Sequence, residues 1–182
     1  MEFEKVYRQI QNTFMELFSE RQIHQITVKQ ICEQVGIART TFYNYFSDIY
    51  EVLESIEDLL IDDLKEINRN FFSQDFHGCG RDDFDYFYTT LTYIRENDYW
   101  FRVLLNKSKD GLFIYKWKKI IREDFAMKYR YEKIRLENED LVLEMIASGV
   151  IGAYMYWVNN FENISVEAVA REVLYKLCRD FI

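Results

Sequence analysis

The sequence predicts an all-α protein of about nine helices, and three observations support this class. The 182 residues contain no proline and only six glycines, whereas turn-rich β architectures depend on both. Apolar residues recur at three- and four-residue spacing, as on one face of an amphipathic helix. Hydrophobic residues make up 49% and charged residues 30% of the chain, which excludes a disordered polymer and allows a buried core.

The N-terminal quarter of the chain shows the clearest order of helices. Apolar residues at helical spacing predict a first amphipathic helix over residues 3–20. Thr27 is a good N-cap for a second, short helix, and Gly36 interrupts the apolar pattern after it. A third short helix is then expected over about 38–45.

The rest of the chain continues the helical pattern. Phe42 and Phe46 are expected to face inward, and Ser47 or Asp48 is expected to cap a long helix over 49–70. A loop with two glycines separates this helix from five more. Their predicted ranges are 82–96, 98–106, 111–134, 138–160 and 165–181, with Asp98 and Ser165 at N-cap positions.

Charge is distributed unevenly along the chain. The net charge is −8, and residues 51–182 carry 18 basic against 25 acidic side chains, a balance of −7. Within residues 21–46, three cations (Arg21, Lys29 and Arg39) stand against Glu33, a balance of +2. An acidic body can therefore carry a locally positive segment. Weak non-specific binding to DNA is expected, because few phosphates would be neutralised.

Several classes of protein are disfavoured by what the sequence lacks. The three cysteines are odd in number and far apart, which indicates a reducing compartment. No signal peptide is recognised, and the longest apolar stretch, 149–158, is ten residues against the roughly 20 of a membrane span. His24 and His77 show no metal-site spacing, and no catalytic or nucleotide-binding motif occurs. We expect a cytoplasmic, non-membrane protein that is not an enzyme and holds no cofactor or metal.

The segment from Thr27 to Phe46, TVKQICEQVGIARTTFYNYF, predicts two short helices around a glycine-containing turn, the geometry of a helix-turn-helix. Arg39 can pair with guanine or a phosphate, Asn44 can pair with adenine, and a phosphate can sit at the helix start beside Thr27. The candidate DNA contacts are Thr27, Lys29, Arg39, Thr40, Thr41, Tyr43, Asn44 and Tyr45. The alternative is an ordinary helical hairpin with exposed polar side chains.

The same segment, residues 26–46, resembles the signature of the TetR family. The matching positions are Thr27, Ile31, Cys32, Val35, Gly36, Ile37, Ala38, Phe42, Tyr43 and Phe46. Two positions depart from the pattern: Ile49 stands where the family usually has a lysine, and Tyr45 replaces a frequent histidine.

The resemblance implies a homodimeric regulator, usually a repressor, that a bound effector releases from a double-stranded DNA operator. By position, the implied DNA contacts are Thr27, Arg39, Thr40, Tyr43 and Tyr45. We therefore expect a DNA-binding domain at 1–46 and a helical domain at 47–182 for dimerisation and for binding a ligand or partner.

The body is rich in aromatic residues, since residues 71–161 contain 21 of the 32 Phe, Tyr and Trp side chains. One interpretation is a pocket for a flat or apolar effector. Its candidate lining residues are Tyr88, Trp100, Phe101, Trp117, Tyr154 and Trp157. The other interpretation is that these rings fill a helical core and a dimer interface.

Small residues gather in the helix predicted over 138–160. Glycine inside a helix costs about 1 kcal/mol relative to alanine, so a close approach between helices is the expected compensation. The last helix shows a wide apolar stripe, and two such helices from each subunit would form a four-helix interface. The candidate residues are Gly149, Gly152, Ala153, Val173 and Leu177. Alternatively, both faces are buried within one subunit.

Residues 148–160, SGVIGAYMYWVNN, resemble the C-terminal part of regulators related to dihydroxyacetone-kinase operon activators. Some members of that subgroup act through a protein partner, which implies a second hypothesis: a DNA-anchored adaptor without a small-molecule pocket. A basic run in the body is either a docking site for an anion or a solvated helix face. It comprises Lys107, Lys109, Lys116, Lys118, Lys119 and Arg122.

Overall fold

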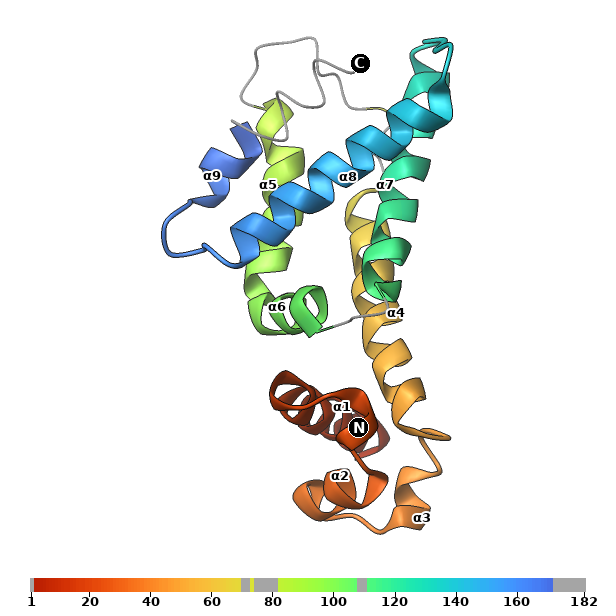
Figure 1. Cartoon of the computed structure of the whole chain (residues 1–182), viewed down its shortest axis with the longest axis vertical. Coiled ribbons are helices and arrows are strands. Elements are labelled where there is room, and N and C mark those ends of the chain that lie inside the picture. Colours follow the sequence, from red (N-terminus) through yellow and green to blue (C-terminus); the bar gives the residue numbers. More distant parts are fainter. Residues whose placement is uncertain (1, 70–72, 74–81, 108–110, 172–182) are drawn as a thin grey trace. The chain divides into compact units, whose positions relative to one another are not determined.

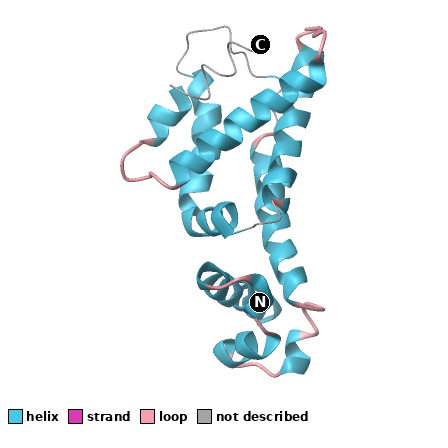
Figure 2. Cartoon of the chain, viewed as in Figure 1, coloured by secondary structure: helices cyan, strands magenta, loops and turns pink. Residues whose placement is uncertain are grey.

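A computed structural model describes residues 2–69, 73, 82–107 and 111–171. Throughout these ranges every regular element is helical, which confirms the all-α class (Figures 1 and 2). The elements are α1 (Glu2–Glu20), the 3₁₀ turn η1 (Ile23–Gln25), α2 (Val28–Val35), α3 (Arg39–Phe42), α4 (Ile49–Ile67), α5 (Asp82–Glu96), α6 (Asp98–Lys107), α7 (Leu112–Tyr131), α8 (Glu139–Val158) and α9 (Val166–Val169).

Contacts within the chain divide it into two compact units, Met1–Ile61 and Asp62–Ile182. The division falls inside α4, so the first part of this helix packs with the N-terminal helices. The predicted domains 1–46 and 47–182 were defined by expected function, whereas these two units are defined by contacts within the chain.

The first unit is built on the apolar faces of its helices. The predicted inward positions are confirmed, since both Phe42 and Phe46 are buried. Its other buried apolar residues include Ile10, Phe14, Met15, Phe18, Ile31, Val52 and Ile56. Polar side chains lie among them as well: Gln11 and Glu57 are each 1% exposed, and Gln11 donates a hydrogen bond from Nε2 to Ser55 Oγ at 3.1 Å. This bond joins α1 to α4.

Several helices end earlier than the periodicity predicts, and the backbone shows the reason in two of them. The helix expected over 38–45 is only Arg39–Phe42, because the N–H groups of Asn44 and Tyr45 donate to carbonyls three residues back, at 3.1 and 2.9 Å. The helix expected over 111–134 ends at Tyr131, since Lys133 adopts a left-handed conformation with φ 58°. Turn hydrogen bonds, which periodicity does not report, decide both ends.

The predicted N-caps have different outcomes. Ser165 does cap α9, because its Oγ accepts a hydrogen bond from Ala168 N–H at 3.2 Å. Asp98 is not a cap: the carbonyl of Asn97 accepts the bond from Phe101 N–H at 3.2 Å, so Asp98 is the first residue inside α6. The rest of the last predicted helix, from residue 172, lies outside the described residues.

In the second unit, α7 packs along α8, and an ion-pair network joins the two helices. Glu144 on α8 accepts hydrogen bonds from both Lys118 and Arg122 on α7, and Arg122 also reaches Asp140 at 3.1 Å. These bonds lower the pKa of Glu144 to about 2. Much of the predicted basic run is therefore paired within the chain, Lys119 with Glu123 included.

One helix, α8, is long and apolar enough to span a membrane by length and composition alone. A core helix of a water-soluble protein meets the same criteria, and α8 packs against both α6 and α7. This pattern is weak evidence for a membrane span.

A buried polar cluster links the end of α4 to α5 and α7. The Thr90 hydroxyl donates to Asn68 Oδ1 at 2.9 Å, and Asn68 in turn hydrogen-bonds to the Asp124 carboxylate. Burial and, to a smaller extent, the negative charge of the neighbouring Glu123 raise the pKa of Asp124 to about 7, against the opposing effect of the hydrogen bond from Asn68. The folded chain therefore holds a proton on Asp124 that the unfolded chain releases at lower pH.

We predict that Asp124→Asn removes a pH-dependent cost. Because the folded carboxyl has a raised pKa, stability should fall as pH rises from about 4 to about 7, and the cost should persist above that range. The variant should melt several degrees above the wild type at pH 8, because about three pKa units correspond to at most roughly 4 kcal/mol and each kcal/mol shifts the melting temperature by about 2–4 °C, and the two should melt close together at pH 4.5. Thermal unfolding at several pH values measures this. Glu137→Gln, at an exposed position, is the control. A difference that is constant across pH would contradict the prediction.

Candidate nucleic-acid interface

The turn between α2 and α3 depends on the backbone conformation of Gly36. This residue has φ 77° and ψ 35°, and its N–H donates to the Cys32 carbonyl at 2.9 Å. An added Cβ would meet no atom within 4 Å, so a side chain would have room here. Glycine is favoured because the backbone is left-handed. The turn redirects the chain into α3.

The start of α2 is closed by a neutral capping box. The Thr27 hydroxyl accepts from Gln30 N–H at 3.3 Å, and Gln30 Oε1 accepts from Thr27 N–H at 2.9 Å. The N–H groups of Val28 and Lys29 in the first turn have no partner within the helix. Such groups carry partial positive charge and suit an anion.

These two features meet at a groove of about 350 Å³ between the start of α2 and α3. Its lining residues are Thr27, Val28, Lys29, Arg39 and Tyr43. Arg39 is exposed, Tyr43 is 57% exposed, and Lys29 forms an exposed ion pair with Glu33 at 3.6 Å. Four sequence-predicted contacts thus lie together around one groove that offers cations, a phenol and helix N–H groups. Val28, which the sequence analysis missed, was signalled only by its place after the N-cap.

The other four predicted contacts differ in accessibility. Thr40 and Asn44 are exposed, whereas Thr41 is half-buried. The ring of Tyr45 is also half-buried, with its centroid 4.3 Å from that of Phe3 and 6.5 Å from that of Tyr7. Tyr45 therefore ties the recognition segment, residues 27–46, to α1.

In the second unit, the structure brings together only part of the predicted effector pocket. Phe101, Trp117 and Tyr154 are buried and pack on one another, with centroid distances of 5.3 Å (Phe101–Trp117) and 5.0 Å (Trp117–Tyr154). Trp157 is also buried: its ring packs edge-on against Phe161 with centroids 4.6 Å apart, and its indole N–H donates to the Ile164 carbonyl at 3.0 Å. This arrangement is what the core-packing alternative expects.

The remaining two predicted pocket residues, Tyr88 and Trp100, are less buried than these four. Tyr88 is exposed and lines a groove of about 380 Å³ between α5 and α9, with Arg95 and Val166 among its neighbours. Trp100 is half-buried. The effector pocket as a set of six residues stays a prediction.

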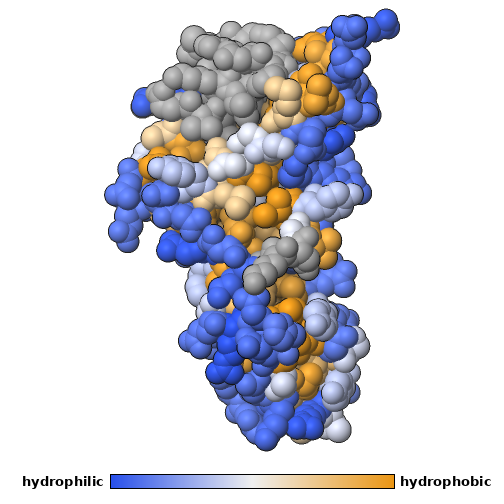
Figure 3. Space-filling view, viewed as in Figure 1, coloured by the Kyte–Doolittle hydropathy of each residue, from blue (hydrophilic) through white to orange (hydrophobic). Residues whose placement is uncertain are grey.

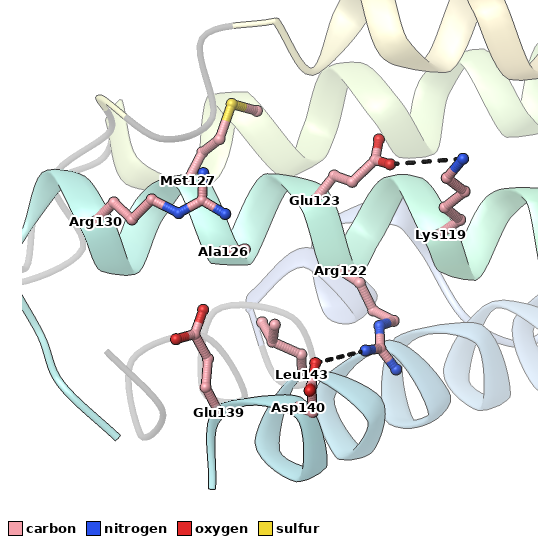
Figure 4. A pocket seen from close by; sticks show the side chains of 9 residues that line it. All are labelled: Lys119, Arg122, Glu123, Ala126, Met127, Arg130, Glu139, Asp140 and Leu143. Atoms are coloured by element: carbon pink, nitrogen blue, oxygen red, sulfur yellow. Dashed lines mark hydrogen bonds and ion pairs between the residues drawn. The ribbon is translucent and has the colours of Figure 1, made fainter. Parts of the chain in front are cut away.

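A larger groove, of about 510 Å³, lies between α7 and α8 (Figure 4). Charged side chains dominate it, and Figure 4 shows Arg122 reaching toward Asp140 and Lys119 toward Glu123. The full lining is Lys119, Arg122, Glu123, Ala126, Met127, Arg130, Glu139, Asp140 and Leu143. Lys119 and Arg122 of the predicted basic run lie in this lining, whereas Glu139 and Asp140 at the start of α8 were not singled out from the sequence.

The predicted interface residues of α8 lie on its exposed face. Gly149 and Gly152 are exposed and Ala153 is half-buried, while Val173 and Leu177 lie outside the described residues. The same face carries large apolar side chains: Leu141 is 60%, Met145 53% and Tyr156 65% exposed. Figure 3 shows apolar residues along α8 on this side of the molecule.

Nothing within the described chain requires glycine at position 152. A Cβ added there would meet no atom within 4 Å, although glycine costs a helix about 1 kcal/mol relative to alanine.

The three helices and the groove define a helix-turn-helix protein, and comparison with known proteins gives the family. The model described as "Bacterial regulatory proteins, tetR family" matches residues 13–56. The model described as "Transcriptional regulator C-terminal region" matches residues 82–177, more than half of the chain. The chain belongs to the TetR family of bacterial transcriptional regulators. Because these families are regulators, membership also confirms that the chain is not an enzyme.

Two curated relatives share limited identity with the chain. The uncharacterized HTH-type transcriptional regulator YxbF of Bacillus subtilis (strain 168) is 23% identical over 185 residues, covering 93% of this chain and 44% of the relative. DhaS of Lactococcus lactis subsp. lactis (strain IL1403), an HTH-type dhaKLM operon transcriptional activator, is 27% identical over 120 residues, covering 62% of this chain and 56% of the relative. The chain thus spans about half the length of these relatives. The similarity to DhaS agrees with the subgroup resemblance of residues 148–160.

A solved structure supports the fold. The TetR transcriptional regulator from Streptococcus agalactiae 2603V superposes with a TM-score of 0.68 at 22% identity, over 97% of this chain and 95% of that one.

We predict that Thr27→Ala destabilises the first unit by about 1 kcal/mol, because it removes both hydroxyl bonds of the capping box. Urea unfolding followed by circular dichroism measures the change. Thr27→Ser keeps the hydroxyl and is the matched control. Equal stability of the alanine and serine variants would show that Gln30 alone holds the helix start.

Proposed function

We propose that this protein is a sequence-specific DNA-binding transcriptional regulator that acts as a homodimer in the cytoplasm. Residues 1–46 would bind a double-stranded DNA operator, and residues 47–182 would dimerise and bind an effector or a partner. The observation that carries the proposal is the groove between α2 and α3, where four predicted contacts meet.

The chemistry of this groove suits a phosphate backbone beside a base edge. The free N–H groups of Val28 and Lys29 and the Tyr43 hydroxyl are donors for phosphate oxygens. Arg39 and Asn44 are also exposed on this segment. The Arg39 guanidinium has two donors for N7 and O6 of guanine, and the Asn44 amide has one donor for N7 of adenine and one acceptor for its N6 amino group. The phosphate contacts would fix the position of α3, and the base contacts would carry the sequence preference.

Dimerisation is supported by the exposed face of α8. A row of exposed Leu141, Met145 and Tyr156 around two glycines is a surface that water solvates poorly. Gly152 permits another helix to approach closely, which supplies the reason for glycine that the single chain lacks. A two-fold dimer would present two recognition segments to half-sites about 34–36 Å, or a multiple of that, apart.

Release from the operator by an effector would make the protein a repressor of the usual type. The alternative is a DNA-anchored adaptor that binds a partner protein and has no small-molecule pocket. A specific observation favours the adaptor: Phe101, Trp117 and Tyr154, three candidate pocket residues, pack against one another. Operator affinity measured with and without the candidate effector or partner distinguishes the two.

We predict that substitutions at two groove residues change DNA binding in different ways. Arg39→Ala should cost about 1–3 kcal/mol at the preferred site and flatten the preference at one base position, because a base contact is lost. Tyr43→Phe should weaken binding to all duplexes alike, since a phosphate contact carries no sequence information. Selection from random-sequence duplexes, followed by fluorescence anisotropy, measures both. Lys65→Ala, an exposed cation of α4 in the second unit, is the control. A wild type without sequence preference would refute the base-reading role of Arg39.

We predict that Gly152→Leu converts the dimer to a monomer, because a bulky side chain would hold the two α8 helices apart. Sedimentation should show the smaller species while circular dichroism remains helical, and affinity for a two-half-site duplex should fall. The matched control is Asn12→Leu, which places the same side chain at an exposed position of α1. A wild type that sediments as a monomer at micromolar concentration would rule the interface out.

A further inference from the structure

The start of α4 is capped by two carboxylates. Asp48 Oδ1 accepts hydrogen bonds from the N–H groups of Tyr50 and Glu51, at 2.8 and 2.9 Å. The Glu51 carboxylate reaches back to accept from Ser47 N–H. Three backbone donors at this helix end are therefore already occupied, and the groups that occupy them are acidic.

Both carboxylates are exposed, and the cap favours the charged form of Glu51. The hydrogen bonds from Ser47 lower the pKa of Glu51. The positive end of the helix dipole also stabilises negative charge in the first turn. The start of α4 therefore presents two negative charges to solvent at neutral pH.

The start of α2 has the opposite character. Its capping box is made by Thr27 and Gln30, which are uncharged, and the N–H groups of Val28 and Lys29 remain available at the groove. The two helix starts flank α3, one before it and one after it. One offers donors to an anion, and the other repels an anion.

The acidic cap lies close to the groove along the chain. Asp48 follows Tyr43 by five residues, a span of at most about 17 Å even when fully extended, and the turns after α3 shorten it. The Debye length is about 10 Å at 0.1 M salt, so a phosphate backbone seated at Tyr43 would feel this charge at low salt. Of the two cations that line the groove, Lys29 is already paired with Glu33 at 3.6 Å, so Arg39 is the cation left to offset this negative charge.

We propose that Asp48 and Glu51 act as an electrostatic brake on DNA binding. The two carboxylates repel the phosphate backbone beside the recognition segment and lower the affinity for duplex DNA whatever its sequence. The inference rests on the proposed DNA-binding function and adds two residues that set its strength. Binding then depends more heavily on the base contacts and on the second half-site of a dimer.

The test neutralises each carboxylate without removing its cap. Asp48→Asn keeps a good N-cap residue, and Glu51→Gln keeps a capping-box side chain. The probe is a random-sequence 30-base-pair duplex, titrated by fluorescence anisotropy in 50, 150 and 400 mM NaCl. Each variant should bind about two- to fivefold more tightly than the wild type at 50 mM, the double variant should gain more, and the gain should shrink at 400 mM.

The matched control is Glu16→Gln, which removes one exposed charge from α1 and should change affinity less than twofold. Circular dichroism and thermal melting confirm that each variant is folded. A wild type that binds the duplex while both folded variants bind no more tightly would overturn the brake alone. Gains that do not depend on salt, or that Glu16→Gln reproduces, would also overturn it. A wild type that binds no duplex at 50 mM NaCl would refute the proposed function, and the brake with it.

Discussion

A helix of a single turn does not hold its shape in water, because fixing its first turn costs more conformational freedom than one hydrogen bond returns. The four residues of α3 are such a helix, and two buried rings hold it in place. Phe42 and Phe46 are buried in the first unit, and Phe46 stacks on Tyr7 of α1 with centroids 4.8 Å apart. Because these rings fix the backbone, Arg39 and Tyr43 are presented from a defined position. The groove, and the function proposed for it, depend on this anchorage.

The two ends of the recognition segment show how capping chemistry sets electrostatics. The capping box of α2 is uncharged, so the partial positive charge at the start of this helix is not offset. At the start of α4, the carboxylates of the cap offset that charge. Charges in the second unit are used differently, since Lys118 and Arg122 are neutralised by Glu144 and Asp140 across the α7–α8 contact. Cations in the body thus serve packing, and the few cations of the first unit remain at its surface. The net charge of the chain says little about where an anion would bind.

Most of the helices could be predicted from the sequence, because apolar residues recur at three- and four-residue spacing along long amphipathic segments. The helix over 82–96 has the predicted bounds, and α1 and α8 differ by at most two residues at either end. The short α3 was overestimated, because a switch to three-residue hydrogen bonds after Phe42 leaves no trace in the apolar pattern. The spacing of apolar residues shows which face of a helix is buried, but it does not show the backbone hydrogen bonds with which the helix ends.

Side-chain roles were harder to predict than helices. Sequence identified Thr27, Lys29, Arg39 and Tyr43, since their types and spacing fit a family signature, and the structure brings them together. It could not show that Trp117 lies between Phe101 and Tyr154, because ring-on-ring packing and a ligand-lined wall use the same residue types. It also could not show that the ring of Tyr45 packs against Phe3, a contact across 42 positions.

The conformation of Gly36 has a consequence for how this sequence can diverge. The position has ample room for a side chain, yet its backbone lies in the left-handed region. Asparagine and aspartate tolerate that region through local hydrogen bonds, whereas β-branched residues do not. The positive φ of Gly36 therefore limits the tolerated substitutions at this position to a few polar residues. An alanine or valine at this position would strain the turn through its own backbone, so the α2–α3 geometry can be lost through a substitution that meets no other part of the described chain.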